Sequence, residues 1–599
     1  MNAIIRRRES FDNNSEVEDQ LPADLPPLLR RIYLARGLHR AQDIDLSLST
    51  LLPPSDLLGI DAACDLLVAA LENQSRILVV GDYDADGATS SALALRALAR
   101  MGHNDVRFMV PNRFEFGYGL SPEIVALARQ QNPALIITVD NGISSIDGVR
   151  AARDAGIDVL ITDHHLAGSE LPDANAIVNP NQPGCTFASK SLAGVGVIFY
   201  VMLALRARLE AMGWFNEARA KPNMAEYLDL VALGTVADVV PLDRNNRILV
   251  EQGLRRIRRG QSCAGIRALI ASAEKSAATL SATDLGFSLG PRLNAAGRLD
   301  DIATGIACLL SDDADFAGEI AAELDELNRN RQTIEQSMQA LAAAQLEKLK
   351  AETEAQGAAM PRALCLHDSE WHQGVVGILA SRIKERYHRP VLCFAPANDA
   401  PDCNELKGSA RSIPGFHIRD ALDAVASQNP GLIQKFGGHA MAAGLSLATQ
   451  DLPHFARAFE AYASETLDDE QLQAVFWSDG ELAADEMSLD NARLVRAALP
   501  WGQKLPAPHF DGVFEILDQR VVGERHLKLS LACATQPARE KSALSKIEAI
   551  AFNVDLDEWP DQNAALVRVG YTLDVNAWRG RESLQFIIRH LEKVEANEE

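Results

Sequence analysis

The stretch VVGDYDADGATSS at residues 79–91 places Asp82, Asp84 and Asp86 at every second position directly after an apolar run. Carboxylates this close repel one another and raise one another's pKa, so a bound cation is the simplest reason for a chain to hold them together. A single aspartate after a strand is often only a helix cap or a turn former. The partners of these three residues elsewhere in the chain therefore decide the interpretation.

Two further apolar runs end in polar residues of the same kind. Residues 135–139 are followed by DNG at 140–142, and residues 157–161 are followed by TDHH at 162–165. Because ligands of open parallel sheets bind at the carboxyl ends of the strands, we expect these side chains to meet in one crevice. Asp238 is a further candidate, since it is a carboxylate in an otherwise apolar run and a buried charge needs a partner or a metal.

The donor types indicate which metal would bind. Carboxylates with one or two imidazoles and no thiolate favour Mn²⁺ or Mg²⁺, and the imidazole favours Mn²⁺. The acidic donors are too many for one ion, and two ions about 3.5–4 Å apart are the arrangement used for phosphoryl hydrolysis. The eight scattered cysteines include no CxxC pair, which argues against a thiolate zinc site and favours a reduced, intracellular protein. We therefore predict two divalent metal ions, with Mn²⁺ preferred.

Several elements must position these residues, because 599 residues are too many for one core. Alternating β runs and helical stretches at 74–180 predict a parallel sheet covered by helices. Residues 319–356 lack Gly and Pro and carry apolar residues at helical spacing, which predicts a long helix joining two lobes. Five β runs after residue 510 predict a small barrel, for which the OB-fold is a candidate. The expected domains are an N-terminal segment (1–69), a catalytic domain (70–310), a connecting helix (311–358), a second α/β domain (359–465) and a barrel domain (466–599).

Composition narrows the function classes. The net charge of −24 argues against a nucleic-acid partner, but a local basic groove can still hold a polyanion. No apolar stretch is as long as a membrane span, and the first twenty residues lack the apolar segment of a secretory signal, so we expect a frayed terminus there. We expect a cytoplasmic monomer that does not associate with membranes.

Eight motifs together resemble a known family. GDYDADG, VDNGIS, TDHH and GTVADVVPL resemble the four motifs of the DHH phosphoesterase family. PNRFEFGYGL, GPRLNAAGRLD, GSARS and FGGHAMAAG resemble those of its RecJ branch of single-strand-specific exonucleases, and the last also marks the DHH-associated domain. Residues 510–590 resemble the RecJ OB domain. The resemblance implies an α/β fold with a parallel-sheet DHH catalytic lobe, a second α/β DHH-associated lobe joined by the long helix, and a C-terminal OB-like β-barrel.

The resemblance also implies roles for the acidic residues and histidines. Asp163 would fix the tautomer of an imidazole, as metal-binding histidines require, and His165 would face the scissile phosphate as donor or acid. Gly87 would let the backbone turn closely under the site. One metal would be held by Asp82, Asp84 and Asp140, and the other by Asp86, Asp140, His164 and Asp238, with Asp140 as the bridge.

Other residues of the motifs suit the substrate. Arginines and a serine in these motifs suit a pocket for a terminal 5′ phosphate, and an aromatic ring can stack on a base. The candidate substrate-binding residues are Arg113, Tyr118, Arg292, Arg298, Ser409, Arg411 and His439. In the barrel, Arg520, Arg525, His526, Lys528, Arg568 and Tyr571 would form a basic and aromatic surface for single-stranded nucleic acid. The arginines at 255, 256, 258 and 259 form a further basic cluster, for which a solvated helix face is favoured over a contact with DNA.

These features lead to one function with three alternatives. The leading prediction is a 5′→3′ exonuclease that is specific for single-stranded DNA, releases 5′-mononucleotides and acts in DNA repair and recombination. The resemblance implies single-strand-binding protein and a repair helicase as partners. A DHH phosphodiesterase of short oligonucleotides or cyclic dinucleotides is the alternative, since such relatives usually lack the barrel. A pyrophosphatase would need neither barrel nor aromatics, and a non-catalytic scaffold would lack metal ligands, all of which are present.

Overall fold

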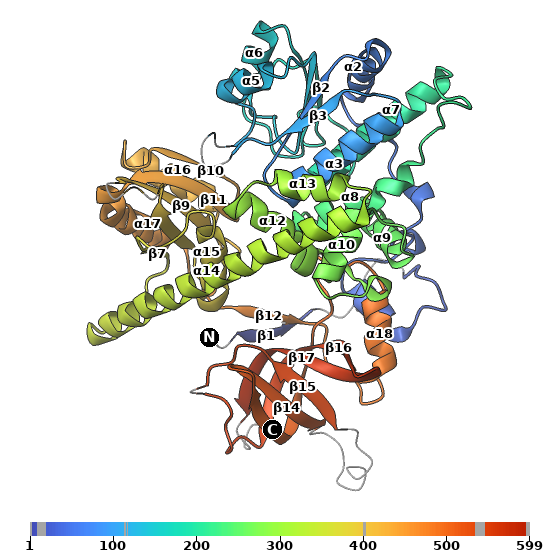
Figure 1. The fold of residues 1–599 in the computed structure, drawn as a ribbon. Coiled ribbons are helices and arrows are strands. Elements are labelled where there is room, and N and C mark those ends of the chain that lie inside the picture. Colours follow the sequence, from blue (N-terminus) through green and yellow to red (C-terminus); the bar gives the residue numbers. More distant parts are fainter. Residues whose placement is uncertain are drawn as a thin grey trace.

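The computed structural model describes residues 3–8, 19–112, 116, 118–398, 400, 403–533, 546–556 and 558–594. Two α/β lobes lie side by side, a long helix runs across both, and a β-barrel lies below them (Figure 1). No helix within these described ranges is long and apolar enough to cross a membrane.

The first lobe is built on a five-stranded parallel sheet with the order β3-β2-β4-β5-β6. Both of its faces are buried: Ile77 and Val79 pack towards α3 and α7, whereas Leu78 and Val80 pack towards α5 and α6. This alternation explains why the strands are apolar throughout. The two edge strands, β3 and β6, were not predicted. The bounds are β2 Ile77–Gly81, β3 Val106–Met109, β4 Leu135–Val139, β5 Asp158–Thr162, β6 Ala176–Val178, α2 Ile60–Asn73, α3 Ala85–Arg100, α5 Pro122–Arg129, α6 Ile146–Asp154 and α7 Gly194–Ala211.

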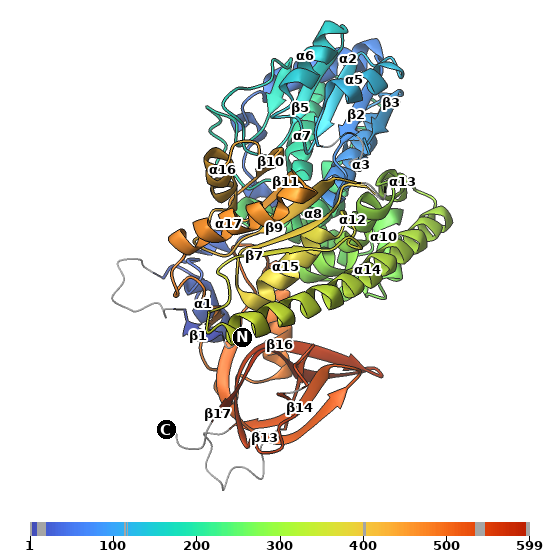
Figure 2. The same cartoon turned by 90° about the vertical axis from the view of Figure 1, so that its left-hand side faces the viewer.

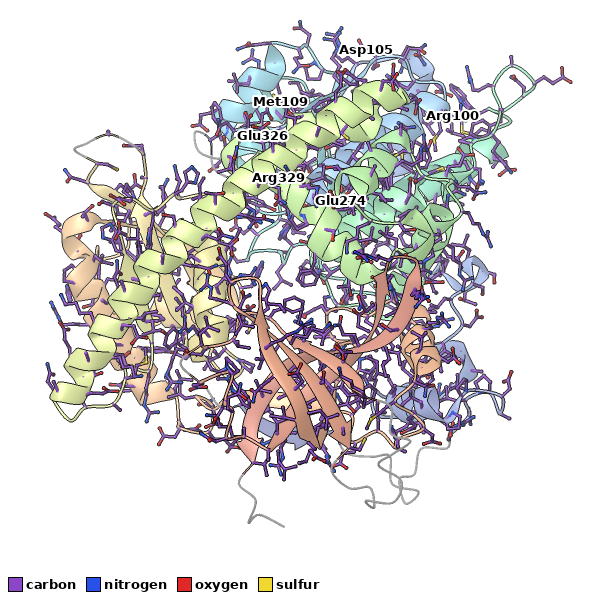
Figure 3. All side chains as sticks on the ribbon, turned by 60° about the horizontal axis from the view of Figure 1, so that its bottom comes forward. Arg100, Asp105, Met109, Glu274, Glu326 and Arg329 are labelled. Atoms are coloured by element: carbon purple, nitrogen blue, oxygen red, sulfur yellow. The ribbon has the colours of Figure 1, made fainter. Side chains whose placement is uncertain are left out.

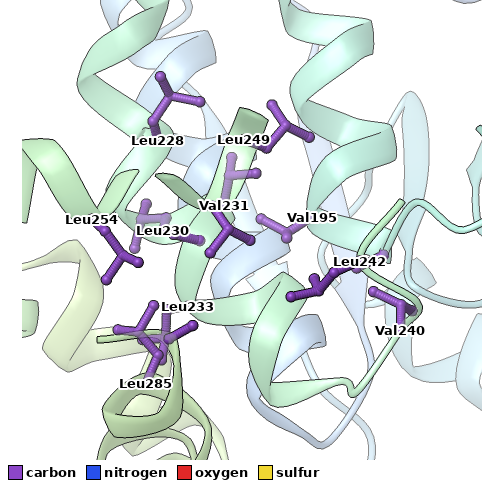
Figure 4. Close-up of a cluster of buried hydrophobic side chains, with 14 of the residues drawn as sticks. Val195, Leu228, Leu230, Val231, Leu233, Val240, Leu242, Leu249, Leu254 and Leu285 are labelled. Atoms are coloured by element: carbon purple, nitrogen blue, oxygen red, sulfur yellow. The ribbon is translucent and has the colours of Figure 1, made fainter. Parts of the chain in front are cut away.

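A helical layer completes this lobe. Helix α8 (Leu228–Ala237) is apolar on all sides because it is enclosed by its neighbours, as Figure 4 shows for Leu230, Val231 and Leu233. A π-helical turn at Leu285–Leu289 leads directly into α12. The other helices of the layer are α9 Arg244–Arg258, α10 Ala264–Ser272, α11 Ala282–Asp284, α12 Gly290–Leu299 and α13 Ala303–Leu310.

The predicted long helix is α14, Ala314–Ala355, with 42 residues. At 1.5 Å per residue it is about 63 Å long. Its first half packs on α10, α12 and α13, and its second half buries Met338, Ala342 and Leu346 against the second lobe. One helix therefore fixes the position of each lobe relative to the other, as the sequence predicted.

The second lobe is an α/β unit with a mixed sheet of order β10-β11-β9-β8-β7. Only β7 and β8 pair in parallel, and the remaining neighbours are antiparallel. The bounds are β7 Leu364–His367, β8 Val391–Pro396, β9 Glu405–Arg411, β10 Lys435–Gly438, β11 Ala442–Ala448, α15 Val376–Tyr387, α16 Ile418–Gln428 and α17 Leu452–Thr466.

The predicted C-terminal barrel is closed, with the order β13-β14-β15-β17-β16. Its core contains Phe510, Phe514, Tyr571 and Phe586, and the rings of Tyr571 and Phe586 stack 3.9 Å apart. The prediction that Tyr571 lies on a nucleic-acid-binding surface is therefore wrong, because its side chain points into the barrel. The bounds are β13 Phe510–Val522, β14 His526–Cys533, β15 Ile547–Ala551, β16 Leu566–Trp578, β17 Arg581–Val594 and α18 Leu489–Ala497.

The beginning of the chain is not frayed at residues 4–7, contrary to the prediction. Strand β1 (Ile4–Arg7) pairs in parallel with β12 (Val475–Ser478), directly before the barrel. Figure 1 shows this pair between the lobes and the barrel, and Figure 2 shows the barrel and the parallel sheet at opposite ends of the molecule. Arg36, which follows α1 (Pro27–Leu34), makes a buried two-pronged ion pair with Asp479 at 2.7 and 2.9 Å. The short 3-10 helices are Ala41–Asp43, Leu48–Thr50, Pro54–Asp56, Met224–Tyr227, Ala277–Thr279 and Thr449–Asp451.

Candidate functional site

The turn after β2 holds the three alternating aspartates. Asp84 caps α3, because its carboxylate accepts hydrogen bonds from the N–H groups of Asp86 (2.9 Å) and Gly87 (3.1 Å). A Cβ atom on Gly87 would lie 2.4 Å from the carbonyl oxygen of Asp82, so only glycine lets the turn close this tightly. The side chain of Asn294 on α12 accepts the N–H of Ala85 at 2.7 Å and holds the turn from the other side.

The amino-terminal end of α7 lies against this turn. The two carboxylate oxygens of Asp86 accept the N–H groups of Gly194 (2.6 Å) and Val195 (2.8 Å), the first two residues of that helix. Asp140 follows β4 in a left-handed conformation, with φ 62°. A Cβ atom on Gly194 would lie 2.6 Å from the Cβ of Asp140, so the helix approaches both carboxylates only because residue 194 is glycine. The positive end of the helix dipole thus offsets part of their charge.

Two adjacent histidines follow β5 and make different contacts. His164 Nε2 lies 3.0 Å from Asp140 Oδ1 and 3.5 Å from Asp238 Oδ2. His165 Nδ1 instead lies 2.8 Å from Asp163 Oδ1, and the Asp163 carboxylate also accepts the N–H of Ile143. The imidazole that Asp163 orients is therefore that of His165.

The carboxylates and imidazoles group into sets that can each hold an ion. The donor atoms within each set lie within 4.8 Å of one another. Asp140 Oδ1 and His164 Nε2 are buried and have no hydrogen-bond partner, as expected of atoms that face an ion. Asp238 reaches its set from the carboxyl end of helix α8, not from a strand. The sets are Asp82, Asp84 and Asp140; Asp86, His164 and Asp238; and Asp140, His164 and His165.

Burial and mutual repulsion perturb the pKa values of these residues. Burial, together with the charge of Asp84, raises the pKa of Asp86 to about 7. Burial and the charge of Asp86 hold the pKa values of Asp140 and Asp238 well above the usual range. Burial lowers the pKa of His164 to about 4, which leaves it neutral and able to bind a metal. A divalent cation would relieve this repulsion, so the residues present are suited to one.

Aromatic rings from both lobes surround His165. The hydroxyl of Tyr118 donates to the carbonyl oxygen of Asp140 (3.0 Å) and lies 3.1 Å from His165 Nδ1. The ring of His439, from the loop between β10 and β11, stacks on His165 with centroids 6.3 Å apart and planes 14° apart. Burial lowers the pKa of His165, but the hydrogen bond with Asp163 and the negative charges of Asp163, Asp82 and Asp84 together outweigh it and raise the pKa above its ordinary value. The second lobe therefore contributes directly to the surroundings of the catalytic candidates.

A cleft of about 710 Å³ lies between the lobes next to these residues. Its walls contain aspartate and aromatic side chains from the first lobe and basic side chains and glycines from the second. The residues that line it include Tyr83, Asp84, Tyr118, Asn294, Arg298, Gly374, Gly377, Lys407, Ser409, Arg411 and Lys435.

Arg411 is the basic residue held most firmly in this cleft. Its Nη1 donates to Ser409 Oγ (3.0 Å) and its Nε to Ser381 Oγ (3.2 Å), and no carboxylate of the described residues lies within 4 Å of it. Its Nη2 faces the first turn of α15, where a Cβ on Gly377 would lie 2.9 Å away. Arg298 reaches the same place and donates to the carbonyl oxygen of Gly374 at 3.0 Å. The arrangement offers guanidinium groups to an anion.

Other candidate residues lie elsewhere. Arg292 pairs with Asp325 on α14 at 2.7 Å and donates to the carbonyl of Ser288, so its charge is already compensated outside the residues that line the cleft. Arg113 lies outside the described residues. In the basic run on α9, Arg255 is half-exposed and pairs with Glu251 at 2.7 Å, which agrees with a solvated face. Arg256 does not agree with it, because its Nε is buried and the residue lines a separate hollow.

Some residues of the site were not predicted. Lys407 and Lys435 line the cleft, and the backbone N–H groups of Gly194 and Val195 bind Asp86. Lys435 directly precedes the FGGHAMAAG motif, which was the available signal. Backbone donors carry no such signal, because every residue except proline has one.

Three family models match this chain. The DHH family, N-terminal domain, matches residues 76–235, the DHHA1 domain matches residues 358–465, and the RecJ OB domain matches residues 478–590. These ranges correspond to the parallel-sheet lobe, the second lobe and the barrel.

Similar proteins match almost the whole chain. The chain is 54% identical over 585 residues to the single-stranded-DNA-specific exonuclease RecJ of Salmonella typhimurium, covering 98% of each chain. It is 53% identical to the protein of that name from Escherichia coli, again covering 98% of each. The crystal structure of RecJ in complex with Mn²⁺ from Thermus thermophilus superposes with a TM-score of 0.75 at 32% identity, covering 94% of this chain and 76% of that one. A Mg²⁺ complex of RecJ from the same organism gives a TM-score of 0.68 at 30% identity, covering 94% and 74%.

Proposed function

This chain belongs to the RecJ family of single-stranded-DNA-specific exonucleases, and we propose that it removes 5′-mononucleotides from single-stranded DNA in the 5′→3′ direction at a two-metal centre. The observation that carries the proposal is the group of metal-donor sets at the edge of the parallel sheet, next to a cleft in which Arg411 has no carboxylate of the described residues within 4 Å. Repair and recombination are the processes in which such an enzyme acts.

The two metal-binding sets share one residue. Asp82, Asp84 and Asp140 would hold one ion, and Asp140 would bridge to the second, as the donor distances allow. The second ion would be held by Asp86, Asp140, His164 and Asp238. Bound divalent ions would supply an activated water and stabilise charge on the phosphate, and the neutral imidazole favours Mn²⁺ over Mg²⁺.

His165 is the proposed proton donor to the reacting phosphodiester. His165 Nδ1 donates its proton to Asp163 Oδ1, 2.8 Å away, and this carboxylate stabilises the protonated ring. The proton on Nε2 is then the one that His165 can donate. Tyr118 and His439 pack against this ring and limit its rotation. Tyr118 is 50% exposed, so one part of its ring remains open to stack on a base.

The polarity would come from the second lobe together with α12 of the first. Arg411, Ser409 and Arg298 would bind the terminal 5′ phosphate at the amino-terminal end of α15, where helix N–H groups also favour anions. Binding this end in the cleft would place the first phosphodiester beside the acidic sets. Arg292 is not part of this proposal, because Asp325 already compensates its charge.

The barrel and the cellular context complete the proposal. An OB-type barrel suits the continuation of the single strand outside the cleft. We propose a cytoplasmic monomer that acts on strands exposed by a helicase, in the presence of single-strand-binding protein. These assignments follow from the substrate and from the family.

An end-label experiment tests the proposal. The protein with Mn²⁺ is incubated with 5′-labelled single strands, 3′-labelled single strands, duplex DNA, dinucleotides and pyrophosphate. We expect immediate release of labelled mononucleotide from the 5′ end of single strands only. Asp140→Ala should abolish release, whereas the matched exposed aspartate variant Asp147→Ala should retain it, because Asp147 lies on the surface and pairs with Arg150. Activity confined to dinucleotides, or near-normal rates in Asp140→Ala, would overturn the proposal.

A further inference from the structure

A second concavity, of about 640 Å³, lies on the first lobe away from the cleft. It is formed by the carboxyl-terminal part of α3, the amino-terminal part of α8 and the loop between α9 and α10. Figure 3 labels Arg100, which lies at its exposed rim. The residues that line it include Leu95, Arg96, Arg100, Val106, Asp229, Leu230, Arg256, Ser262 and Arg267. We call this concavity the arginine pocket.

Two of its four arginines have carboxylate partners. Arg96 donates to the carbonyl oxygens of Leu309 (3.3 Å) and Leu310 (2.9 Å) and pairs with Asp312. Arg100 lies 4.0 Å from a carboxylate oxygen of Glu226. These two residues are largely neutralised by the protein itself.

The other two arginines have no such compensation. Arg256 donates to the carbonyl oxygen of Gln261 at 3.2 Å, and Arg267 donates to that of Ser262. In the described part of the chain, no carboxylate oxygen lies within 4 Å of either guanidinium, and Arg256 Nε is buried without an acceptor.

The carboxylate at the base of the pocket is bound mainly by backbone groups. Asp229 accepts the N–H groups of Leu230 and Cys263, both at 2.8 Å. Burial raises its pKa above the ordinary value, and the more distant charges of Arg256 and Arg96 oppose that rise. A pair of cationic side chains therefore faces a hollow in a protein whose net charge is −24.

The opposite wall is apolar. Leu95, Val106 and Leu230 line the hollow on the side of α3 and α8. Its volume is in the range of pockets that enclose small organic ligands, about 300–1,000 Å³. A hollow with an apolar wall and two guanidiniums whose acceptors among the described residues are backbone carbonyls suits one phosphate group attached to a flat apolar group.

Helices α3 and α8 each carry a metal-ligand candidate at one end and residues of the arginine pocket at the other. Helix α3 carries Asp86 in its first turn and Arg96 ten residues later, about 15 Å along its axis. Helix α8 ends at Asp238 and carries Asp229 in its first turn. The two helices pack against each other, so a ligand that shifts one end would shift the acidic sets at the other.

We propose that the arginine pocket binds a free nucleoside 5′-monophosphate, held by Arg256 and Arg267, and that occupancy adjusts the acidic sets through α3 and α8. The identification of this ligand as the reaction product rests on the proposed function. The binding of the ligand to the arginine pocket can be tested independently of that function.

Calorimetric titration of the full-length protein with 2′-deoxyadenosine 5′-monophosphate, in EDTA, tests the proposal. The background variant Arg411→Gln removes nucleotide binding in the cleft, and one binding site should remain in it. Adding Arg256→Gln and Arg267→Gln should weaken that remaining binding at least tenfold. Adding Arg255→Gln, on the same helix but paired with Glu251, should leave it unchanged. Arg267→Gln alone, at an exposed position, should already weaken it several-fold and guards against misfolding of the triple variant.

The alternative outcomes separate this proposal from the preceding one. Loss of all binding in Arg411→Gln would overturn the arginine pocket and leave the cleft assignment intact. Two sites in Arg411→Gln, with one lost on changing Arg256 and Arg267, would support the pocket and contradict the cleft assignment. Equal affinity for inorganic phosphate would show a bare anion site and overturn the nucleotide. Binding of a single-stranded oligonucleotide that depends on Arg267 would instead identify a DNA path.

Discussion

Arg411 offers the sharpest test of how the cleft selects a 5′ end. Its Nη1 and Nε groups are already bound to Ser409 and Ser381, which fixes the guanidinium plane and leaves Nη2 directed at the first turn of α15. Replacing it in Arg411→Gln removes one charged hydrogen bond to a terminal phosphate. Such a bond contributes about 1.5–3 kcal/mol, so kcat/KM for a 5′-phosphorylated strand should fall about 10- to 150-fold.

The assay compares two substrates within each variant. Mononucleotide release is measured from oligonucleotides of one sequence that carry either a 5′ phosphate or a 5′ hydroxyl. Because the hydroxyl end cannot use Arg411, its kcat/KM should change less than about threefold, and the ratio isolates the lost contact from any general loss of stability. Arg382→Gln is the matched control, since Arg382 lies on α15 but pairs with Glu335 of α14.

Two results would refute this reasoning. An equal fall for both substrates would show that Arg411 supports the fold of the second lobe and not the 5′ end. An unchanged ratio with unchanged rates would show that the terminal phosphate binds elsewhere.

Three further predictions concern the metal centre and the docking of the domains. Burial raises the pKa of Asp86 to about 7, far above its ordinary value of about 3.9, so the metal-free fold is stabilised by proton uptake and loses that stability as the pH rises through 7. The Tm of EDTA-treated protein should therefore rise as the pH is lowered from 8 to 5, and Tm should depend less on pH in Asp86→Asn. A Tm that does not change with pH would contradict the raised pKa of Asp86. Gly194→Ala should weaken Mn²⁺ binding at least about tenfold in calorimetry, because the new Cβ would lie 2.6 Å from the Cβ of Asp140 and displace its carboxylate. Unchanged affinity would show that α7 moves away without disturbing Asp140. Arg36→Met should lower the free energy of unfolding by about 1.5–3 kcal/mol in denaturant titrations, because it leaves the buried Asp479 with only the longer contact to Arg8, at 3.5 Å, among the ion pairs of the described residues. Asp479→Leu in the same chain should restore part of that loss.

The metal-binding residues could be predicted because topology leaves little choice for them. Parallel strands place their carboxyl ends at one edge, so the aspartates after β2 and β4 and the histidines after β5 had to meet. Asp238 was recognisable as a lone charge in an apolar run, although the sequence did not indicate that it terminates a helix. The helix α14 and the barrel followed from periodicities of 3.6 and 2 residues, which depend only on local spacing.

The remaining features depend on contacts between distant parts of the chain. Arg292 and Arg411 both occur in recognisable motifs, and only the presence of Asp325 beside the first distinguishes their environments. Tyr571 occurs in a strand whose alternate side chains face the barrel core, and a shift of one residue in register would have exposed it. The pairing of β1 with β12 joins four residues to a segment more than 460 positions later, beyond any local pattern.

That last pairing has a consequence for synthesis in the cell. The parallel-sheet lobe contains all of its strands by residue 178 and α7 and α8 by residue 237, so it can assemble while the ribosome is still making α14. Residues 4–7, made first, must wait for residues 475–478. At about 5–20 residues per second this delay is about 20–100 s. During that interval Ile4 and its neighbours lack their partner strand. The pairing forms only when residues 475–478, directly before the barrel, have been made.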